Sequence, residues 1–352
     1  MMEVREATED DNGALLELQR KSPMGTNLVL RLDSSPDFFA RSRPYEDWHV
    51  LVATEDGKIV GSAAYAPKEV LIDGEPVKTA YEYGFIVDPE RRRRGIASML
   101  QEQIEERVRD DVGLLHLNIT EDNLPSVSLF TKLGFKMVKE CRAYMLMAYR
   151  EQRLVDEARI RGMIQADVAD VVSILNHFYR DHIFYRPLTA EDFLRYYRRL
   201  PYFDMQNVLV YDDEGVKACL GYWDYNKVMK FAVERYNWRL RTLSAILKVA
   251  GLFAEMPRVP RQGEQLSNWY FTPIACRDPK ELSELVKYIL NKALKERVDF
   301  ISTPLDPGGP LASILSAFRR NEGKFSWYMK SLRHSPVPDL SDKKLYVDVV
   351  DV

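Results

Sequence analysis

The stretch from Tyr81 to Ala97 joins an apolar strand to an amphipathic helix through a short loop that carries four consecutive arginines and ends in a glycine. The first turn of such a helix exposes unpaired backbone N–H groups and the positive end of the helix dipole. Basic residues are electrostatically unfavourable at this end unless an anion binds there. Arg91–Arg94 therefore predict a polyphosphate site, with a solvated run of charges as the alternative.

The composition is that of an ordinary globular protein. The chain has 352 residues, which suggests two domains, and 46% of them are hydrophobic and 29% charged. A formal net charge of −3 gives no basic field for nucleic acid, so we expect no nucleic-acid partner. The three cysteines are far apart, which favours reduced thiols and offers no metal-ligand spacing. We see neither a signal peptide nor a run of about 18–20 apolar residues, and we expect a cytoplasmic protein without a membrane span.

Hydrophobic periodicity predicts alternating strands and helices in the first half of the chain. The expected strands cover residues 4–7, 48–54, 59–65, 78–87, 115–119, 135–138 and 143–148, and the expected helices begin after Thr8, at Ile96 and at Asn123. The turn at Glu55-Asp56-Gly57 is typical of a β-hairpin. This order describes an α/β sandwich of about 150 residues.

The second half repeats this order, which indicates an internal duplication. Charged residues 149–158 are expected to form a linker helix, and a strand and a helix follow at 159–163 and 166–179. The later elements are a hairpin (207–211 with 217–222), strands at 269–275 and 298–303, helices at 279–296 and 310–319, and strands near 325–332 and 344–350.

Two motifs resemble the GNAT (GCN5-related) N-acetyltransferase superfamily. Arg92-x-x-Gly95-x-Ala97, five residues after Val87, resembles its pyrophosphate loop, and Asn123 to Phe135 resembles its second conserved motif. The resemblance implies an α/β (α+β) fold with two GNAT-like mixed-sheet acyl-CoA N-acyltransferase domains in tandem. Residues 1–150 would form an N-acetyltransferase domain that binds acetyl-CoA. Residues 157–352 would form a degenerate copy with a helical insertion near 228–262.

The resemblance also implies where acetyl-CoA binds. Pro89 cannot donate a hydrogen bond and ends strand pairing, and in the family this strand parts from its neighbour and pairs with pantetheine. A strand N–H near Val87 would hold the oxyanion. The implied cofactor-binding residues are Phe85, Ile86, Val87, Arg92, Arg93, Arg94, Gly95, Ile96, Ala97, Ser98, Asn123, Ser126 and Phe130, and no metal is expected.

The implied chemistry is direct attack of a neutral amine on the thioester within a ternary complex. Phe130 stands where the family often has a tyrosine acid, so Ser128, Tyr144 or water would protonate the departing thiolate, unless it leaves unassisted. Tyr81, Glu82 and Tyr83 are candidate bases, with His116 an outside candidate. Strand alternation places Glu82 opposite the tyrosines unless a bulge intervenes. We take Glu82, Tyr83 and Tyr144 as the catalytic candidates.

Residues 24–47 match the variable substrate loop of the family and are expected to shape the pocket of an amine-bearing small molecule or peptide. Acidic and aromatic side chains could hold a cationic amine there, although solvated loop charges are the alternative for each. The candidates are Asp33, Asp37, Glu46, Phe38, Phe39 and Trp48.

The second half lacks the loop. Residues 276–282 have no glycine before the helix and carry acids where phosphates would lie, so we expect no coenzyme A there. This half would complete the acceptor cleft or mediate contacts in a homodimer. Residues 236–254 have the pattern of a basic amphipathic helix, which we expect to cover the second domain or a dimer mate rather than a membrane. The leading interpretation is an N-acetyltransferase, and the alternative is a non-catalytic acyl-CoA-binding or scaffolding protein.

Overall fold

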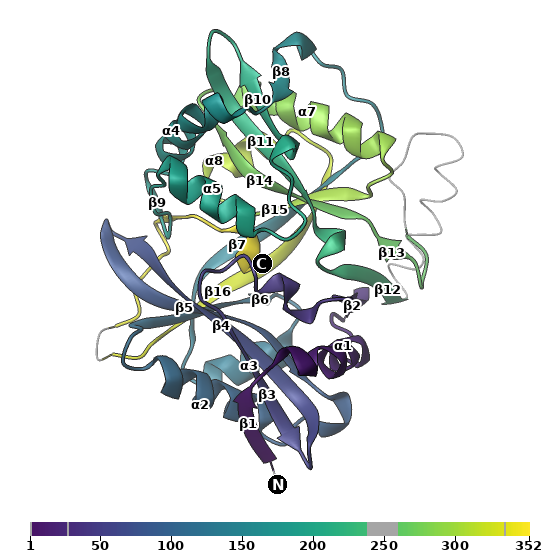
Figure 1. Ribbon diagram of the computed structural model, residues 1–352, viewed down its shortest axis with the longest axis vertical. Coiled ribbons are helices and arrows are strands. Elements are labelled where there is room, and N and C mark those ends of the chain that lie inside the picture. The colour runs from purple at the N-terminus through teal and green to yellow at the C-terminus, as the bar shows by residue number, and fades with distance from the viewer. Residues whose placement is uncertain (1, 27, 238–259, 334–335) are drawn as a thin grey trace.

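A large mixed sheet runs through the whole molecule in the computed structural model, which describes residues 2–26, 28–237, 260–333 and 336–352 (Figure 1). Within these residues the sheet has 12 strands. Their order is β1 (Met2–Glu6), β3 (His49–Glu55), β4 (Lys58–Ile72), β5 (Glu75–Val87), β6 (Leu114–Thr120), β16 (Arg320–Ser331), β7 (Lys136–Met147), β15 (Phe300–Leu305), β14 (Asn268–Cys276), β11 (Val216–Asp224), β10 (Val208–Asp212) and β8 (Ile160–Gly162).

Helices cover this sheet and two small sheets complete the described part of the chain. The helices are α1 (Asn12–Lys21), α2 (Ile96–Val108), α3 (Leu124–Lys132), α4 (Val168–Phe178), α5 (Ala190–Arg199), α7 (Pro279–Lys295) and α8 (Pro310–Leu315). The small sheets are β13 (Gln265–Leu266), β12 (Lys230–Tyr236) and β2 (Leu28–Asp33), and β17 (Lys344–Leu345) with β9 (His182–Ile183). The expected mixed α/β fold is confirmed.

The two halves of the chain exchange a strand at the centre of the sheet. Strand β16, from the end of the chain, lies between β6 and β7, where Tyr328 faces Leu117. Strand β7, from the first half, pairs on its other side with β15, where Tyr144 faces Thr303. Each half therefore supplies a strand to the other, and the boundary expected near residue 150 separates sequence segments that share one continuous sheet.

Several expected elements differ from the structure. The two closing strands of the first half are one strand, β7, because its middle residues pair with β16 in spite of their charges. Residues 149–156 form no helix. The insertion expected near 228–262 begins as β12, which pairs with β2, and the rest of it, with most of the amphipathic pattern at 236–254, lies outside the described residues.

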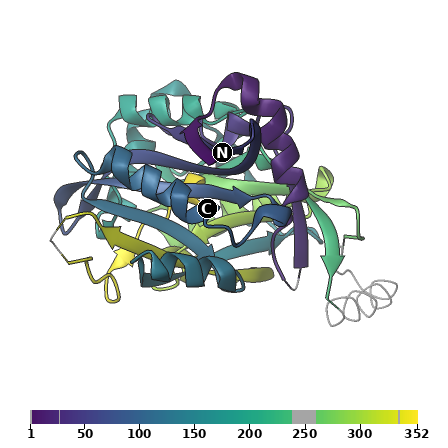
Figure 2. The same ribbon diagram turned by 90° about the horizontal axis from the view of Figure 1, so that it is seen from below.

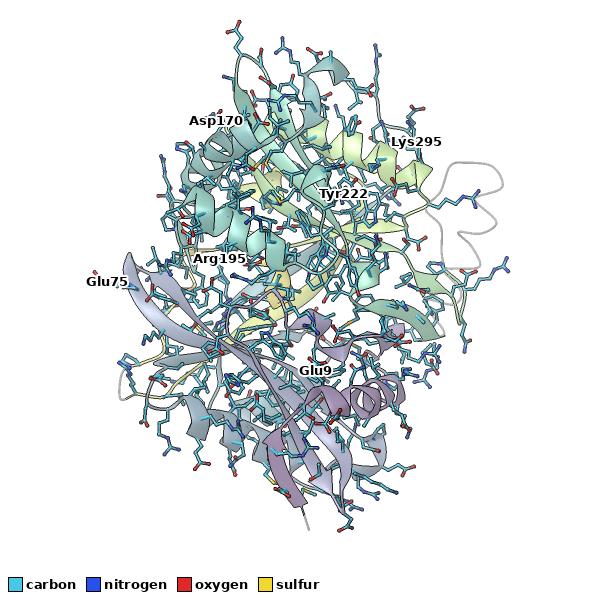
Figure 3. The ribbon with its side chains drawn as sticks, viewed as in Figure 1. Glu9, Glu75, Asp170, Arg195, Tyr222 and Lys295 are labelled. Atoms are coloured by element: carbon cyan, nitrogen blue, oxygen red, sulfur yellow. The ribbon has the colours of Figure 1, made fainter. Side chains whose placement is uncertain are left out.

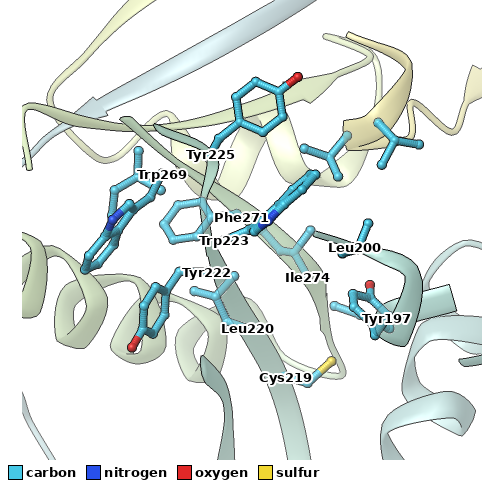
Figure 4. Close-up of a cluster of buried hydrophobic side chains, with 14 of the residues drawn as sticks. Tyr197, Leu200, Cys219, Leu220, Tyr222, Trp223, Tyr225, Trp269, Phe271 and Ile274 are labelled. Atoms are coloured by element: carbon cyan, nitrogen blue, oxygen red, sulfur yellow. The ribbon is translucent and has the colours of Figure 1, made fainter. Parts of the chain in front are cut away.

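The largest hydrophobic core extends across both halves. It includes Leu15 of α1, Tyr83 of β5 and Tyr144 of β7, together with the cluster of the second half around Trp223 and Phe271 (Figure 4). A second core lies under α2, whose buried Ile96, Leu100 and Ile104 recur along one face of the helix. The C-terminal residues lie at the centre of the molecule in both ribbon views (Figures 1 and 2).

Candidate acyl-CoA site

Strands β5 and β6 part in the middle of the sheet. Their parallel pairing covers Thr79–Tyr81 with Leu114–His116 and goes no further among the described residues. Beyond that point β5 stays paired with β4, while β6 pairs with β16. The backbone of Glu82–Val87 therefore has no strand partner on its β6 side. An extended ligand can take those hydrogen bonds, as the sequence predicted for this strand end.

A β-bulge shapes the end of β5. Ser62 pairs with Ile86 and Ala64 pairs with Tyr83, so Gly84 and Phe85 lie opposite one residue of β4. Gly84 has φ +65°, a left-handed conformation that favours glycine. Because the bulge follows Tyr83, it does not bring Glu82 and Tyr83 to one face.

The loop after β5 delivers an open helix end to the same place. Asp88 accepts a hydrogen bond from the backbone N–H of Glu90 (2.9 Å), and Arg93 (φ 63°) and Gly95 (φ 80°) both adopt left-handed backbone. Gly95 is the N-cap of α2 and makes no side-chain cap. Because Gly95 has no side chain to accept from them, the backbone N–H groups of the first turn, Ile96–Ser98, are available to donate hydrogen bonds to an anion.

The four arginines divide into two pairs. Arg91 and Arg94 reach Glu55 of β3, at 2.7 Å and 3.5 Å, and so tie the loop to the sheet. The side chain of Arg92 donates to the carbonyl of Val87 (3.3 Å), and both Arg92 and Arg93 are exposed without a carboxylate partner in the described part of the chain. Arg92 and Arg93 are thus the charges of the loop that remain for a phosphate.

Helix α3 borders the same strand end. Asn123 caps the helix by accepting from the backbone N–H of Ser126 (3.3 Å). Phe130 is buried and contacts Phe85 edge to face, with ring centroids 5.0 Å apart. The fold therefore brings together the two motifs that are separated in sequence.

The helix that follows β14 in the second half, α7, is closed by its own side chains. Asp278 accepts from the backbone N–H of Lys280 (2.8 Å), and Glu281 accepts from the backbone N–H of Asp278 (3.3 Å). This capping box places two carboxylates at the helix start, where α2 has a bare glycine. An additional anion is disfavoured at α7 for the same electrostatic reason that favours it at α2.

The three catalytic candidates lie in three different surroundings. Glu82 is buried on the α2 side and accepts from Gln101 Nε2 (2.8 Å), and burial raises its pKa to about 8. The protonated form is therefore favoured at neutral pH in this structure, and Glu82 must lose that proton before it can act as a base. Tyr83 lies on the opposite face and donates to Ser42 Oγ (2.8 Å), and burial raises its pKa, so it is a hydrogen-bond donor and not a base.

Tyr144 lies elsewhere. It is on β7, between Thr303 and Glu322, and its ring lies 4.3 Å from the guanidinium carbon of Arg320. Strands β6 and β16 lie between β7 and β5, which carries Tyr83, so the sheet keeps these two candidates apart. His116 is also enclosed: it stacks on Trp327, and burial lowers its pKa, which keeps it neutral.

The acidic residues of the acceptor loop already have partners. Asp37 caps η2 (Phe38–Arg41) and pairs with Arg43 (2.9 Å), and Asp33 accepts from the backbone N–H of Ser35 (2.9 Å). Glu46 pairs with Arg199 (2.8 Å) and with Arg195 of α5, which Figure 3 shows at the boundary between the halves. These carboxylates hold the loop and the two halves in place. Phe39 and Trp48 do form an aromatic wall, with ring centroids 5.9 Å apart.

The sequence reasoning missed the contribution of residues 348–351. The carbonyl of Val350 accepts from Tyr45 (2.7 Å), and the carbonyl of Asp351 accepts from Tyr81 and from Asn118 (2.7 Å). The buried carboxylate of Asp351 forms an ion pair with Lys68. Asp348 accepts from Tyr196 (2.6 Å), and burial raises its pKa. No local pattern marks these residues, because their partners lie hundreds of positions away.

The second half contains a comparable parting of strands. Parallel pairing of β14 and β15 ends at Tyr270 and Ser302, and a cavity of about 40 Å³ lies beyond that point. Its lining includes Tyr179, His182 and Tyr346, and the C-terminal segment forms part of its wall. Little space is therefore left where β14 and β15 part. The self-capped start of α7 distinguishes the second half from the first, whereas the C-terminal segment contacts both halves, since Asp351 accepts from Tyr81 of β5 and Asn118 of β6.

The described residues contain neither a membrane-spanning helix nor a metal-binding cluster. None of the helices there is long and apolar enough to cross a membrane. No group of three or more His, Cys, Asp or Glu side chains in that part of the chain could hold a metal ion.

The structure has the fold of acyl-CoA-dependent N-acyltransferases. With 12% identity and a TM-score of 0.64, it is similar to Saccharomyces cerevisiae N-myristoyltransferase with bound myristoyl-CoA, over 93% of this chain and 82% of that one. It is also similar to the GCN5-related glucosamine N-acetyltransferase region of a fungal multi-domain GH3 β-N-acetylglucosaminidase (TM-score 0.60, 14% identity, 94% of this chain and 38% of that one). A GCN5-related N-acetyltransferase from Kribbella flavida gives a TM-score of 0.51 at 12% identity, over 94% and 71% of the two chains.

The sequence match is narrower. Residues 15–135 match the model of the acetyltransferase (GNAT) family, and no curated protein matches the chain in sequence. The matched segment contains β5, the arginine loop and α3. Residues 15–135 are thus a GNAT family domain, and the family match together with the shared fold supports an acyltransferase enzyme.

Proposed function

We propose that this protein transfers an acetyl group from acetyl-CoA to a primary amine by direct attack within a ternary complex. The observation that carries the proposal is the parting of β5 from β6 directly beside the uncapped start of α2. Together they offer backbone pairing for a pantetheine arm and N–H groups with two free arginines for a diphosphate. The yeast N-myristoyltransferase structure contains myristoyl-CoA, and the fungal region is described as a glucosamine N-acetyltransferase. Of these two acyl groups, we propose acetyl as the one that this protein transfers.

The proposed roles follow from the positions of the residues. Phe85, Ile86 and Val87 would pair with the pantetheine arm through their backbone, and Arg92–Ser98 would bind the diphosphate. A backbone N–H at the bulge would stabilise the oxyanion of the tetrahedral intermediate. Attack forms the C–N bond, and collapse of the intermediate breaks the C–S bond, so that the thiolate leaves with the electron pair. The proton that the amine nitrogen gives up passes to solvent, directly or by way of the departing thiolate. Tyr83, beside the bulge, is our candidate hydrogen-bond donor to the reacting atoms, and in this role its hydroxyl would exchange Ser42 Oγ for the substrate.

The second half would complete the acceptor cleft for an amine-bearing small molecule or peptide. Its support is the core that both halves share around Tyr83 and the insertion of residues 348–351 between them. We also propose a cytoplasmic location, which the three buried free cysteines fit, and homodimerisation remains a prediction from the sequence.

The experiment that tests this function is turnover. Purified protein with acetyl-CoA and a panel of primary amines is expected to release free thiol only with an acceptor, in equal amount to the acetylated product identified by mass spectrometry. Tight binding of acetyl-CoA without turnover of any amine would instead support the non-catalytic acyl-CoA-binding function.

A further inference from the structure

Arg41 is a positive charge without an anion at the junction of the two halves. It is the last residue of η2, and its guanidinium carbon lies 5.3 Å from the centre of the Tyr83 ring. Its Nε atom is buried and has no hydrogen-bond partner. Within the residues that the structure describes, no carboxylate lies within ion-pair distance of Arg41.

The surrounding tyrosines do not neutralise this charge. Burial raises the pKa values of Tyr45, Tyr81, Tyr83 and Tyr225, so their hydroxyls stay protonated at neutral pH. The hydroxyls of the first three donate elsewhere: to Val350 O, Asp351 O and Ser42 Oγ respectively. The rings therefore give Arg41 cation–π contact and little else.

The side chain of Arg41 is half-buried, and its buried Nε has lost water without gaining a partner, which is costly. The planar fork of donors of a guanidinium matches a carboxylate or a phosphate. The position of Arg41 connects it to the proposed reaction. Tyr83, the ring beneath its guanidinium, immediately precedes the Gly84–Phe85 bulge, where the thioester is expected. An anion on Arg41 would thus lie one tyrosine ring away from the reacting carbonyl.

We propose that Arg41 binds an oxyanion of the acceptor, so that the acceptors of this enzyme are primary amines that also carry a carboxylate or a phosphate. This inference rests on the proposed function and names the substrate class of the same site. It reverses the sequence expectation of a loop that selects for positive charge, because Asp33, Asp37 and Glu46 are already paired whereas Arg41 is not.

The kinetic test compares acceptors that differ only in charge: butylamine, 4-aminobutanamide, 4-aminobutyrate and 3-aminopropyl phosphate, together with shorter and longer homologues. The wild-type protein is expected to acetylate an anionic member with a kcat/KM about 10- to 100-fold above that of its neutral partner. Arg41→Gln should abolish this preference and Arg41→Lys should keep part of it, and Arg277→Gln, at an exposed arginine after β14, is the control. Preference for carboxylate over phosphate, or the reverse, identifies the anion. Equal kcat/KM for charged and neutral amines in the wild type would overturn the proposal.

A stability measurement keeps the inference testable if no amine is acetylated. Arg41→Met should raise the melting temperature, because it removes a half-buried charge whose Nε has no partner, and 4-aminobutyrate or 3-aminopropyl phosphate should stabilise only the wild type. A lower melting temperature for Arg41→Met with no ligand effect in either protein would show that Arg41 is structural and would overturn the proposal. Absence of turnover in the first experiment, with the stability result intact, would instead count against the proposed function alone.

Discussion

Phe85 of β5 and Phe130 of α3 meet edge to face with their ring centroids 5.0 Å apart, and Phe130 meets Phe135 in the same way at 5.4 Å. This contact joins the strand that ends at the arginine loop to the helix that carries the second motif. It also explains why a residue without a hydroxyl is stable here: Phe130 is 3% exposed and lies among rings. In this structure Phe130 holds the two walls of the site together.

Truncating this side chain should therefore loosen the site. Phe130→Ala is expected to lower the free energy of unfolding by about 3–4 kcal/mol, because it leaves a cavity between two rings. Denaturant unfolding followed by tryptophan fluorescence measures the change. Leu124→Ala, on the same helix at 69% exposure, is the matched control and should change the stability little.

Arg92 and Arg93, the two exposed arginines of the loop without a carboxylate partner among the described residues, should affect the binding of acetyl-CoA and not that of the amine. Arg92→Gln with Arg93→Gln is expected to raise the KM for acetyl-CoA about tenfold or more, with a smaller effect at high salt. Arg109→Gln, at the other end of α2, is the control. An unchanged KM for acetyl-CoA in the double variant would show that the diphosphate does not bind at this loop.

Glu82 should make stability depend on pH. Its pKa is raised from about 4.5 to about 8, so the folded protein keeps a proton that the unfolded chain releases in that window. Stability then falls as pH rises from about 4.5 to about 8, by roughly 2–5 kcal/mol in total. Glu82→Gln should flatten this slope and be more stable than wild type above about pH 8. An equally steep slope in the variant would contradict the burial argument, and Glu102→Gln on α2 is the control.

The ion pair of Lys68 with Asp351 should stabilise the insertion of the C-terminal segment. The carboxylate is 2% exposed, so Lys68→Met leaves it uncompensated and should cost about 2–4 kcal/mol. Adding Asp351→Asn should recover part of this loss. A double-mutant cycle by thermal or denaturant unfolding measures the coupling, and additive effects would mean that the pair contributes nothing.

The local parts of this molecule were predictable from the sequence. Helix α2 follows from the spacing of Ile96, Leu100 and Ile104, and the hairpin of β3 and β4 follows from the turn at Asp56-Gly57, where both residues have positive φ. The open helix end follows from Gly95. Each of these features depends on residues within a few positions of one another.

The non-local parts were not predictable. The charges in the middle of β7 interrupt its alternation, and only pairing with β16, about 180 residues later, makes it one strand. The partners of Asp37 and Glu46, and the absence of one for Arg41, likewise depend on the folded arrangement. The acidic residues of this loop are therefore engaged in ion pairs, whereas Arg41 forms none with the described residues.

The most direct test of the acyl-CoA site uses the charge at one position. Gly95→Asp would place a carboxylate at the start of α2, as Asp278 does at α7, whereas Gly95→Asn has the same shape without the charge and also tolerates left-handed backbone. Calorimetric titration with acetyl-CoA should show binding to the wild type and to Gly95→Asn, and a dissociation constant at least about tenfold higher for Gly95→Asp. Equal affinity of the two variants would contradict binding of the diphosphate at this helix end.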